Sequence, residues 1–183
     1  SGLCGLVCYL MLSRLTALRH GGPSAASDGY KRQNQALADT FSVDVEVPRK
    51  RVAEYHAPYV AFWVENADRS TLKPLGLWYD DQEKWLKDIR QWWRRTGRSQ
   101  SAPYDGLTGA TRSPGTHTVD FSKLDALQSL PAGEYTLVVE AAREVGGREV
   151  VKLPFRWPAE KTPQQQQVKG TDELGTVTLT VSQ

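Results

Sequence analysis

The feature that most constrains the fold is a series of short β-strand patterns separated by turn residues. The clearest pattern is GEYTLVVEAA, residues 133–142, in which β-branched and aromatic side chains dominate. Gly146 and Gly147 then form a tight hairpin turn that leads into a second strand at residues 148–155. Because strands joined by so short a connection run antiparallel, this region predicts an antiparallel hairpin.

Similar strand patterns recur between residues 42 and 183. Residues 42–47 alternate strictly between valines and polar residues, whereas residues 59–65, YVAFWVE, are apolar on both faces, as in a central strand. Pro74, within the strand expected at residues 72–79, marks an edge or a bulge. A weaker strand is expected at residues 115–121, and residues 174–181 form the last strand, with its apolar residues on one face. Residues 164–167 are expected to form a polar loop. About seven such strands predict a mainly β, Ig-like antiparallel sandwich.

One segment breaks this pattern and predicts a single inserted helix over residues 84–98, KWLKDIRQWWRRTGR. Its apolar residues recur at the spacing of one helical face, namely Trp85, Leu86, Ile89, Trp92 and Trp93. We expect Asp80, Asp81 and Glu83 to cap its start, and Gly97 to end it. The apolar face is then part of the core.

The basic residues of this helix make up most of the candidate binding residues. Lys87, Arg90 and Arg94 share one face, with Lys84, Arg95 and Arg98 around it. Such a basic surface can dock an anionic ligand, an acidic protein or a lipid headgroup. The alternative is an ordinary helix whose charges are simply solvated. The net charge of +2 for the chain is too small to indicate binding of nucleic acid.

Two other segments contain candidate binding residues. The loop at residues 104–115, rich in glycine and threonine, includes Asp105, Thr111 and Arg112. It can present backbone N–H groups to an anion, or it is a structured turn held by Asp105 and Arg112. Tyr55 and His56 precede the strand at residues 59–65, where a lone histidine is more often structural than a metal ligand.

The sequence contains no constellation that predicts catalysis. It has no nucleophile elbow and no paired cysteine and histidine, and its two cysteines lie near the N-terminus, outside the expected domain. We therefore expect no catalytic residue, no metal ligand and no resident cofactor. The carboxylates of Glu140 and Glu144 are expected to form structural ion pairs with Arg143 and Arg148.

The N-terminal part of the chain predicts separate segments. Residues 2–12 are apolar but shorter than the roughly 20 residues of a membrane span. Residues 1–27 are therefore interpreted as the end of a truncated transmembrane helix, as a signal peptide, or as a buried N-terminal helix. We expect residues 28–41 to be a polar linker and residues 42–183 to be the folded domain.

Several long motifs occur together in the order found in one bacterial family. They are AEYHAPYVAFWVENAD, KWLKDIRQWWRRTGR, DGLTGATRSPG and LPAGEYTLVVEAAREVGGREVVKLPF. On these motifs, residues 42–182 resemble the family of predicted periplasmic proteins designated domain of unknown function 2271. The run LPAGEYTLVV is also similar to the Ig-like module of the flagellar hook-capping protein.

The resemblance implies a periplasmic domain, tethered to the inner membrane if the N-terminal segment is an anchor. Members of the family are often encoded beside PepSY-type membrane proteins, flavin transferases and outer-membrane iron receptors. This neighbourhood implies a non-catalytic binding or scaffolding module for a protein partner in the inner membrane or periplasm, accessory to a membrane redox or iron-uptake system.

Other functions are left open by the sequence. The main alternative is a small-ligand carrier for haem, flavin or a ferric complex, with His56, the tyrosines and the arginines forming its site. An enzyme, and a carbohydrate-binding module that uses the six tryptophans, are further alternatives.

Overall fold

The computed structural model describes residues 39–80 and 82–183. The predictions for residues 1–27 and for most of the linker lie outside this part of the chain. The first strand begins at Thr40, ahead of the expected start at residue 42. It includes Phe41, whose side chain is fully buried, so the folded domain extends into the expected linker.

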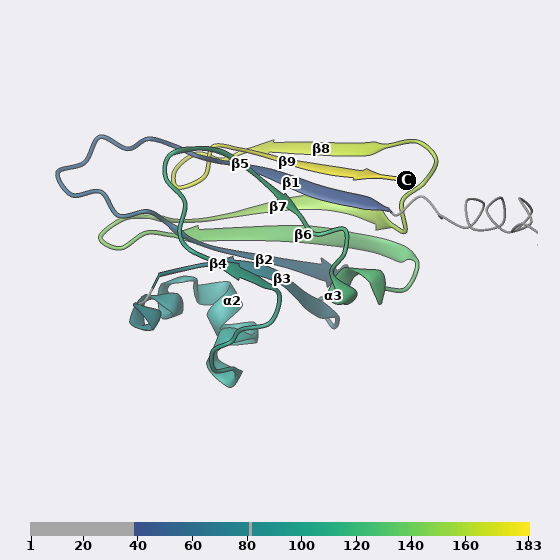
Figure 1. Cartoon of the computed structure of the whole chain (residues 1–183), viewed down its shortest axis with the longest axis horizontal. Helices are drawn as coiled ribbons and strands as arrows, with labels where there is room; N and C mark the ends of the chain where they lie inside the picture. Colours follow the sequence, from purple (N-terminus) through teal and green to yellow (C-terminus); the bar gives the residue numbers. More distant parts are fainter. Residues whose placement is uncertain (1–38, 81) are drawn as a thin grey trace, which may run out of the picture. The chain divides into compact units, whose positions relative to one another are not determined.

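Two β-sheets stacked on each other form the body of the domain (Figure 1). The strands of the four-stranded sheet, in spatial order, are β5 (Gly115–Asp120), β1 (Thr40–Val47), β9 (Thr176–Ser182) and β8 (Gln164–Lys169). Those of the five-stranded sheet are β4 (Leu107–Gly109), β3 (Leu72–Trp78), β2 (Tyr59–Asn66), β6 (Gly133–Ala142) and β7 (Arg148–Trp157). All neighbours pair antiparallel except β3 and β4, which are parallel. The predicted mainly β sandwich is confirmed.

The side-chain alternation of the strands creates the main core between the sheets. Val43, Val45 and Val47 of β1 are buried there, as their spacing predicts. Phe41 is packed among aromatic rings, with ring centroids 5.1 Å from Phe155 and 6.1 Å from Trp157. The outward-facing positions of β1 are only half-buried. One face of β1 therefore packs into the main core, and the other face points outward.

Pro74 lies at a bulge in β3, which confirms one of the two positions predicted for it. Trp63 pairs with Pro74, whereas the preceding residue Phe62 pairs with Gly76. Leu75 is the extra residue and is fully buried. A bulge is a position where the missing N–H group of proline is tolerated within a sheet.

The prediction of a single helix over residues 84–98 is wrong, because the segment forms three short helices. They are the 3-10 helix η1 (Glu83–Asp88), the α-helix α2 (Arg90–Arg95) and the 3-10 helix η2 (Gly97–Ser99). Between η1 and α2, Ile89 has a ψ angle of 75°, which is not helical. Gly97 does follow the end of α2, where a Cβ atom would lie 2.4 Å from the Trp92 ring.

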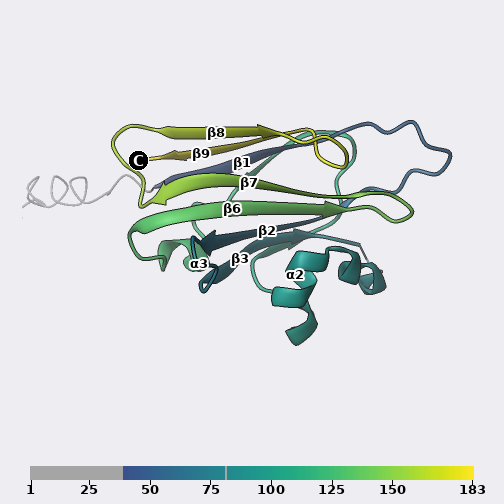
Figure 2. The ribbon, with the colours of Figure 1, turned by 180° about the vertical axis from the view of Figure 1, so that it is seen from behind.

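These helices cover the outer face of the five-stranded sheet (Figures 1 and 2). Leu86, Ile89 and Trp92 are buried against Trp63 and other outward-facing residues of the sheet, forming a second core. The acidic residues that were expected to cap the start of the helix do not occupy its N-cap position. Asp80 accepts hydrogen bonds from the Gln82 amide and the Tyr59 hydroxyl, and Gln82 itself is the N-cap residue. Asp81 lies outside the described residues.

The prediction of a polar loop at residues 164–167 is also wrong, because this segment forms the edge strand β8. β8 pairs with β9 through its backbone, and most of its glutamine side chains are exposed. An edge strand needs few apolar residues when its side chains face solvent, so composition alone conceals it. The sequence reasoning also missed β4 and the short helix α3 (Asp125–Gln128).

We predict that Phe41→Ala lowers the free energy of unfolding by about 3–5 kcal/mol, because it leaves a cavity among the rings of Phe121, Phe155 and Trp157. Urea denaturation of purified protein measures this loss. Val145→Ala is the matched control, since Val145 is 89% exposed and its change should cost less than about 0.5 kcal/mol. A loss below about 1 kcal/mol for Phe41→Ala would contradict the inclusion of residue 41 in the core.

Candidate functional site

Two carboxylates are buried on the outer face of the five-stranded sheet, beneath the helices. Glu65 at the end of β2 is 4% exposed, and Glu140 in β6 is fully buried. Their neighbours Val64 and Val139 point into the main core, so the pleat directs both carboxylates outward. Because a buried carboxylate is costly without charged or hydrogen-bonding partners, each must be satisfied by the layer above it.

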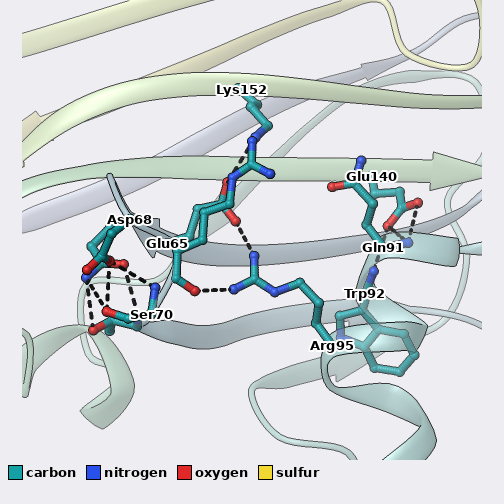
Figure 3. A network of polar contacts seen from close by, with 11 residues as sticks. Glu65, Asp68, Ser70, Gln91, Trp92, Arg95, Glu140 and Lys152 are labelled. Carbon is teal, nitrogen blue, oxygen red and sulfur yellow. Dashed lines mark hydrogen bonds and ion pairs between the residues drawn. The ribbon is translucent and has the colours of Figure 1, made fainter.

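Glu140 binds the first turn of α2 (Figure 3). Its carboxylate accepts the backbone N–H groups of Gln91 at 3.0 Å and of Trp92 at 2.9 Å. It also accepts a hydrogen bond from Arg148 Nε at 2.7 Å. Glu140 therefore acts as the N-terminal cap of α2, although it lies about fifty residues away in the sequence.

This contact gives a physical reason for the break between η1 and α2. In a continuous helix, the N–H groups of Gln91 and Trp92 would bond to the carbonyls of Lys87 and Asp88. The non-helical Ile89 releases these N–H groups, and Glu140 accepts both. The helix therefore breaks at Ile89 to satisfy the buried carboxylate, although the apolar spacing of the sequence continues across the break.

Glu65 gathers three cations on the same face. Its carboxylate contacts Arg95 Nη1 at 2.5 Å and Lys152 Nζ at 2.9 Å, with Arg69 Nε at 3.7 Å (Figure 3). Burial alone would raise the pKa of Glu65. The hydrogen bond and charge of Lys152, with a contribution from the hydrogen bond of Arg95, hold this pKa below its ordinary value.

The turn between β2 and β3 presents Arg69 to this cluster. Arg69 has a φ of 59°, an uncommon left-handed conformation for a residue with a side chain. Asp68 stabilises the turn by accepting the Ser70 amide at 3.0 Å. In this conformation the carbonyl of Arg69 accepts a hydrogen bond from Arg95 Nη2 at 2.6 Å. The guanidinium of Arg95 is therefore held by two partners.

Above the two carboxylates lies a continuous basic area, which we term the cationic surface. It consists of Arg69, Lys87, Arg90, Arg94, Arg95, Arg148 and Lys152. Two shallow hollows occur in it, with volumes of about 420 and 460 Å³. Arg94 lines both hollows, so it lies at the centre of the surface.

The cations of this surface fall into two groups. Arg69, Arg95, Arg148 and Lys152 are paired with the buried carboxylates. In contrast, Lys87, Arg90 and Arg94 form no ion pair with any carboxylate of the described residues, although Asp88 lines one of the hollows with them. The first group is structural, and the second leaves positive charge available to a partner.

The structure brings together four of the six predicted helix cations. Lys87, Arg90, Arg94 and Arg95 all line the hollows of the cationic surface. The ammonium of Lys84 instead lies 4.9 Å from the centre of the Trp85 ring. Arg98 lies in η2 and lines neither hollow.

Tyr55 and His56 lie elsewhere in the fold. Tyr55 lines a separate cavity beside the end of β1. His56 lies 3.1 Å from a carboxylate oxygen of Glu54 and 3.7 Å from one of Glu144. Neither residue lines the hollows of the cationic surface, so the structure does not join them to the helix cations.

The predicted loop residues form a third location. Asp105 accepts a hydrogen bond from Gln100 Nε2 at 2.6 Å, and Thr111 is half-buried. The guanidinium of Arg112 lies over the Trp78 ring, 5.6 Å from its centre. Asp105 and Arg112 therefore have separate partners, and do not hold the loop through a contact with each other.

Sequence reasoning missed the cations contributed by the sheet. Arg148 and Lys152 occupy alternate positions of β7, opposite the buried Val151 and Leu153. That alternation is a signal that they share the outer face. The position of Arg69 depends on its turn conformation, which the sequence does not reveal.

The predicted structural ion pairs are confirmed in part. Glu140 pairs with Arg148, as expected. Arg143 instead forms a buried pair with Glu173 at 2.9 Å, and Glu144 lies near His56. The pairing of Arg143 depends on the turn before β9, which the strand pattern alone does not place.

Within residues 39–80 and 82–183, no group of three or more His, Cys, Asp or Glu side chains is arranged to hold a metal ion. The helices in this part of the chain are also too short or too polar to cross a membrane.

The family resemblance of the chain is confirmed by comparison with family models. Residues 40–176 match the model described as predicted periplasmic protein (DUF2271). The chain belongs to this family. The match includes the helices as well as both buried carboxylates, so it covers the whole candidate site. No curated protein and no solved structure matches the chain.

We predict that Glu140→Gln lowers the free energy of unfolding by about 2–4 kcal/mol, because it leaves Arg148 unpaired and weakens the cap of α2. Urea denaturation measures the loss. Glu144→Gln is a matched control on the same hairpin and should cost less than about 0.5 kcal/mol. Equal effects of the two substitutions would contradict the anchoring role of Glu140.

We predict that Glu65 contributes stability that depends on pH. Because its folded-state pKa is lowered, this contribution is complete above the unfolded-state pKa and is lost as the pH falls below about 4.5. Glu65→Gln should therefore cost about 2 kcal/mol at pH 7, and the difference from the unchanged protein should shrink at pH 3. Unfolding measured from pH 3 to pH 7 tests this. A difference that does not change with pH would contradict it.

Proposed function

We propose that the protein is a non-catalytic periplasmic binding module that docks an acidic protein partner through its cationic surface. We further propose that it serves a membrane redox or iron-uptake system, the role implied by the neighbourhood of its relatives. The observation that carries this proposal is the group formed by Lys87, Arg90 and Arg94, which have no carboxylate partner among the described residues.

The support beneath these cations favours specific docking. Glu140 holds the first turn of α2, and Glu65 holds Arg95 in its last turn. The backbone that presents Arg90 and Arg94 is thus fixed at both ends. A preorganised charged surface loses less conformational entropy on binding than a flexible one, and it increases the association rate with an acidic partner.

A second candidate is the carriage of a small anionic ligand such as flavin mononucleotide or ferric citrate. The favouring observation is that Trp93 lines one hollow together with Arg90 and Arg94, so that an aromatic ring lies beside the cations. Such a ligand should quench the fluorescence of Trp93. His56 lies outside these hollows, so the arrangement offers haem no support from that side chain.

We predict that replacing Lys87, Arg90 and Arg94 by glutamate abolishes docking while the protein stays folded. Arg95 is kept because it pairs with Glu65. A photo-crosslinking residue at position 91, beside the hollow, should capture a partner in cells of the source bacterium. The triple substitution should remove this adduct. The same crosslinker at the exposed position 118 should give none.

The matched control is glutamate at Lys123, Lys161 and Lys169, which are exposed and lie outside the cationic surface. It changes the net charge by the same amount and should retain the adduct. Equal loss of the adduct in both variants would contradict a specific surface. If flavin mononucleotide or ferric citrate instead shows saturable quenching that the first triple variant abolishes, the small-ligand function replaces the docking function.

A further inference from the structure

The four-stranded sheet ends in the edge strand β8, whose outer edge pairs with no strand of the described residues. β8 pairs with β9 alone, and the order of the sheet places β8 at its end. An unpaired edge presents a row of N–H and C=O groups that can extend the sheet into another chain. β8 lies on the side of the sandwich away from α2 (Figures 1 and 2). This edge is therefore separate from the cationic surface.

The edges of the five-stranded sheet are protected against such pairing, whereas β8 is not. On one side this sheet ends in β4, which has only three residues. On the other side it ends in β7, which contains the charged residues Arg148, Glu149, Lys152 and Arg156. Short length and charged side chains are common means by which edge strands avoid pairing. In contrast, β8 is uncharged from Gln164 to Val168.

The alternation of the backbone determines which residues of β8 face the open edge. The Gly170 amide, directly after β8, donates to the Gly175 carbonyl at 2.7 Å, so it points toward β9. Because successive residues of a strand direct their backbone groups to opposite sides, the even-numbered residues of β8 also face β9. The bond from the Phe121 amide to the Phe41 carbonyl gives the same assignment through the registers of β1, β9 and β8. The residues that face the open edge are Gln165, Gln167 and Lys169.

The side chains at this edge suit contact with an identical strand. Val168 packs against the main core, so Gln165 and Gln167 point to the outer face of the sheet, where both are exposed. The side chain of Gln164 is occupied within the domain, because it accepts the Arg156 amide at 2.9 Å. A glutamine side chain both donates and accepts hydrogen bonds, so glutamines of two copies can bond to each other.

A two-fold axis through this edge fixes the register of such a pair. In an antiparallel ladder, hydrogen-bonded pairs form where outward-facing residues of both strands lie opposite each other. With the axis at Gln167, this residue meets its own copy, and Gln165 meets Lys169 of the second copy. Every outward N–H and C=O group of β8 then has a partner. With the axis at Gln166, Lys169 would meet Pro163, which has no N–H group.

Charge also favours a second copy as the occupant of this edge. In the register centred on Gln167, Lys169 lies opposite a neutral glutamine, and no like charges meet directly across the pair. Two-fold symmetric dimers are the commonest oligomers of soluble proteins. We propose that two copies of this chain pair antiparallel through β8, centred on Gln167, and so join their four-stranded sheets. Both cationic surfaces stay accessible in this dimer, because they lie over the five-stranded sheets.

Disulfide formation between single introduced cysteines tests the register. The full chain is used with Cys4 and Cys8 replaced by serine, so that the introduced cysteine is its only thiol. Gln167→Cys should give a disulfide-linked dimer on mild oxidation, because Cα atoms of a hydrogen-bonded pair are about 5.5 Å apart, within the range of a disulfide. Gln165→Cys is the matched control. Its two copies would lie roughly 14 Å apart along the strands, so it should give no linked dimer.

Proline substitution separates pairing by β8 from contacts elsewhere in the chain. The Gln167 N–H group faces the open edge, so Gln167→Pro removes a donor of the dimer but no bond of the ladder between β8 and β9. Sedimentation velocity of the unchanged full chain should show a dimer that forms as concentration rises, whereas Gln167→Pro should stay monomeric. Its Tm should fall by less than about 4 °C, since it loses only an exposed side-chain bond to Thr178. Gln166→Pro is the control and should lower the Tm further, because its N–H group faces β9.

Three results would overturn the inference. They are a monomer at every concentration of the unchanged chain, equal yields of linked dimer in Gln167→Cys and Gln165→Cys, and a dimer that persists in Gln167→Pro. A monomer whose β8 captures a different protein would likewise exclude a second copy as the occupant. The triple substitution of Lys87, Arg90 and Arg94 should leave dimerisation unchanged, so failure of docking and failure of dimerisation can be distinguished.

Discussion

The arrangement of the outer layer depends on the carboxylate of Glu140. This side chain is fully buried on β6, an interior strand of the five-stranded sheet, and it accepts the two N–H groups that begin α2. An isolated helix as short as α2 is not stable in water, so its position must come from tertiary contacts. The apolar part of these contacts comes from Leu86, Ile89 and Trp92. The polar part comes from Glu140, which binds the N-terminal N–H groups of α2 and so fixes the position of this end of the helix. The sheet therefore determines where the helix begins.

The two buried carboxylates also determine which cations of the cationic surface are paired within the domain and which remain available to a binding partner. Glu65 pairs with Arg69, Arg95 and Lys152, Glu140 pairs with Arg148, and these pairs stabilise the layer. Arg90 and Arg94 lie on the same short helix but have no carboxylate partner among the described residues. The basic segment of the sequence is thus divided between structural and exposed charge. This division explains why removing Arg94 and removing Arg95 should have different consequences, the first for docking and the second for folding.

The sequence predicts the strands well because their signals are local. The alternation of β1 and the hairpin of β6 and β7 are present in contiguous residues, and the structure confirms both. The break at Ile89 could not be predicted in this way, since it depends on Glu140 from a distant strand. Likewise, β8 is held by its pairing with β9 and has almost no apolar pattern of its own. The candidate site was found only in part, because Arg69, Arg148 and Lys152 join the helix cations through the fold.

The most direct test of the account is amide hydrogen exchange at Gln91 and Trp92. These N–H groups have no acceptor within α2, so without Glu140 they would exchange quickly even in a folded helix. We predict that both exchange at least about 1,000-fold more slowly than in an unstructured chain, like the amides of Trp93 and Thr96, which are bonded within the helical segment. Rapid exchange at Gln91 and Trp92, with Trp93 and Thr96 still protected, would contradict the claim that Glu140 anchors the helix.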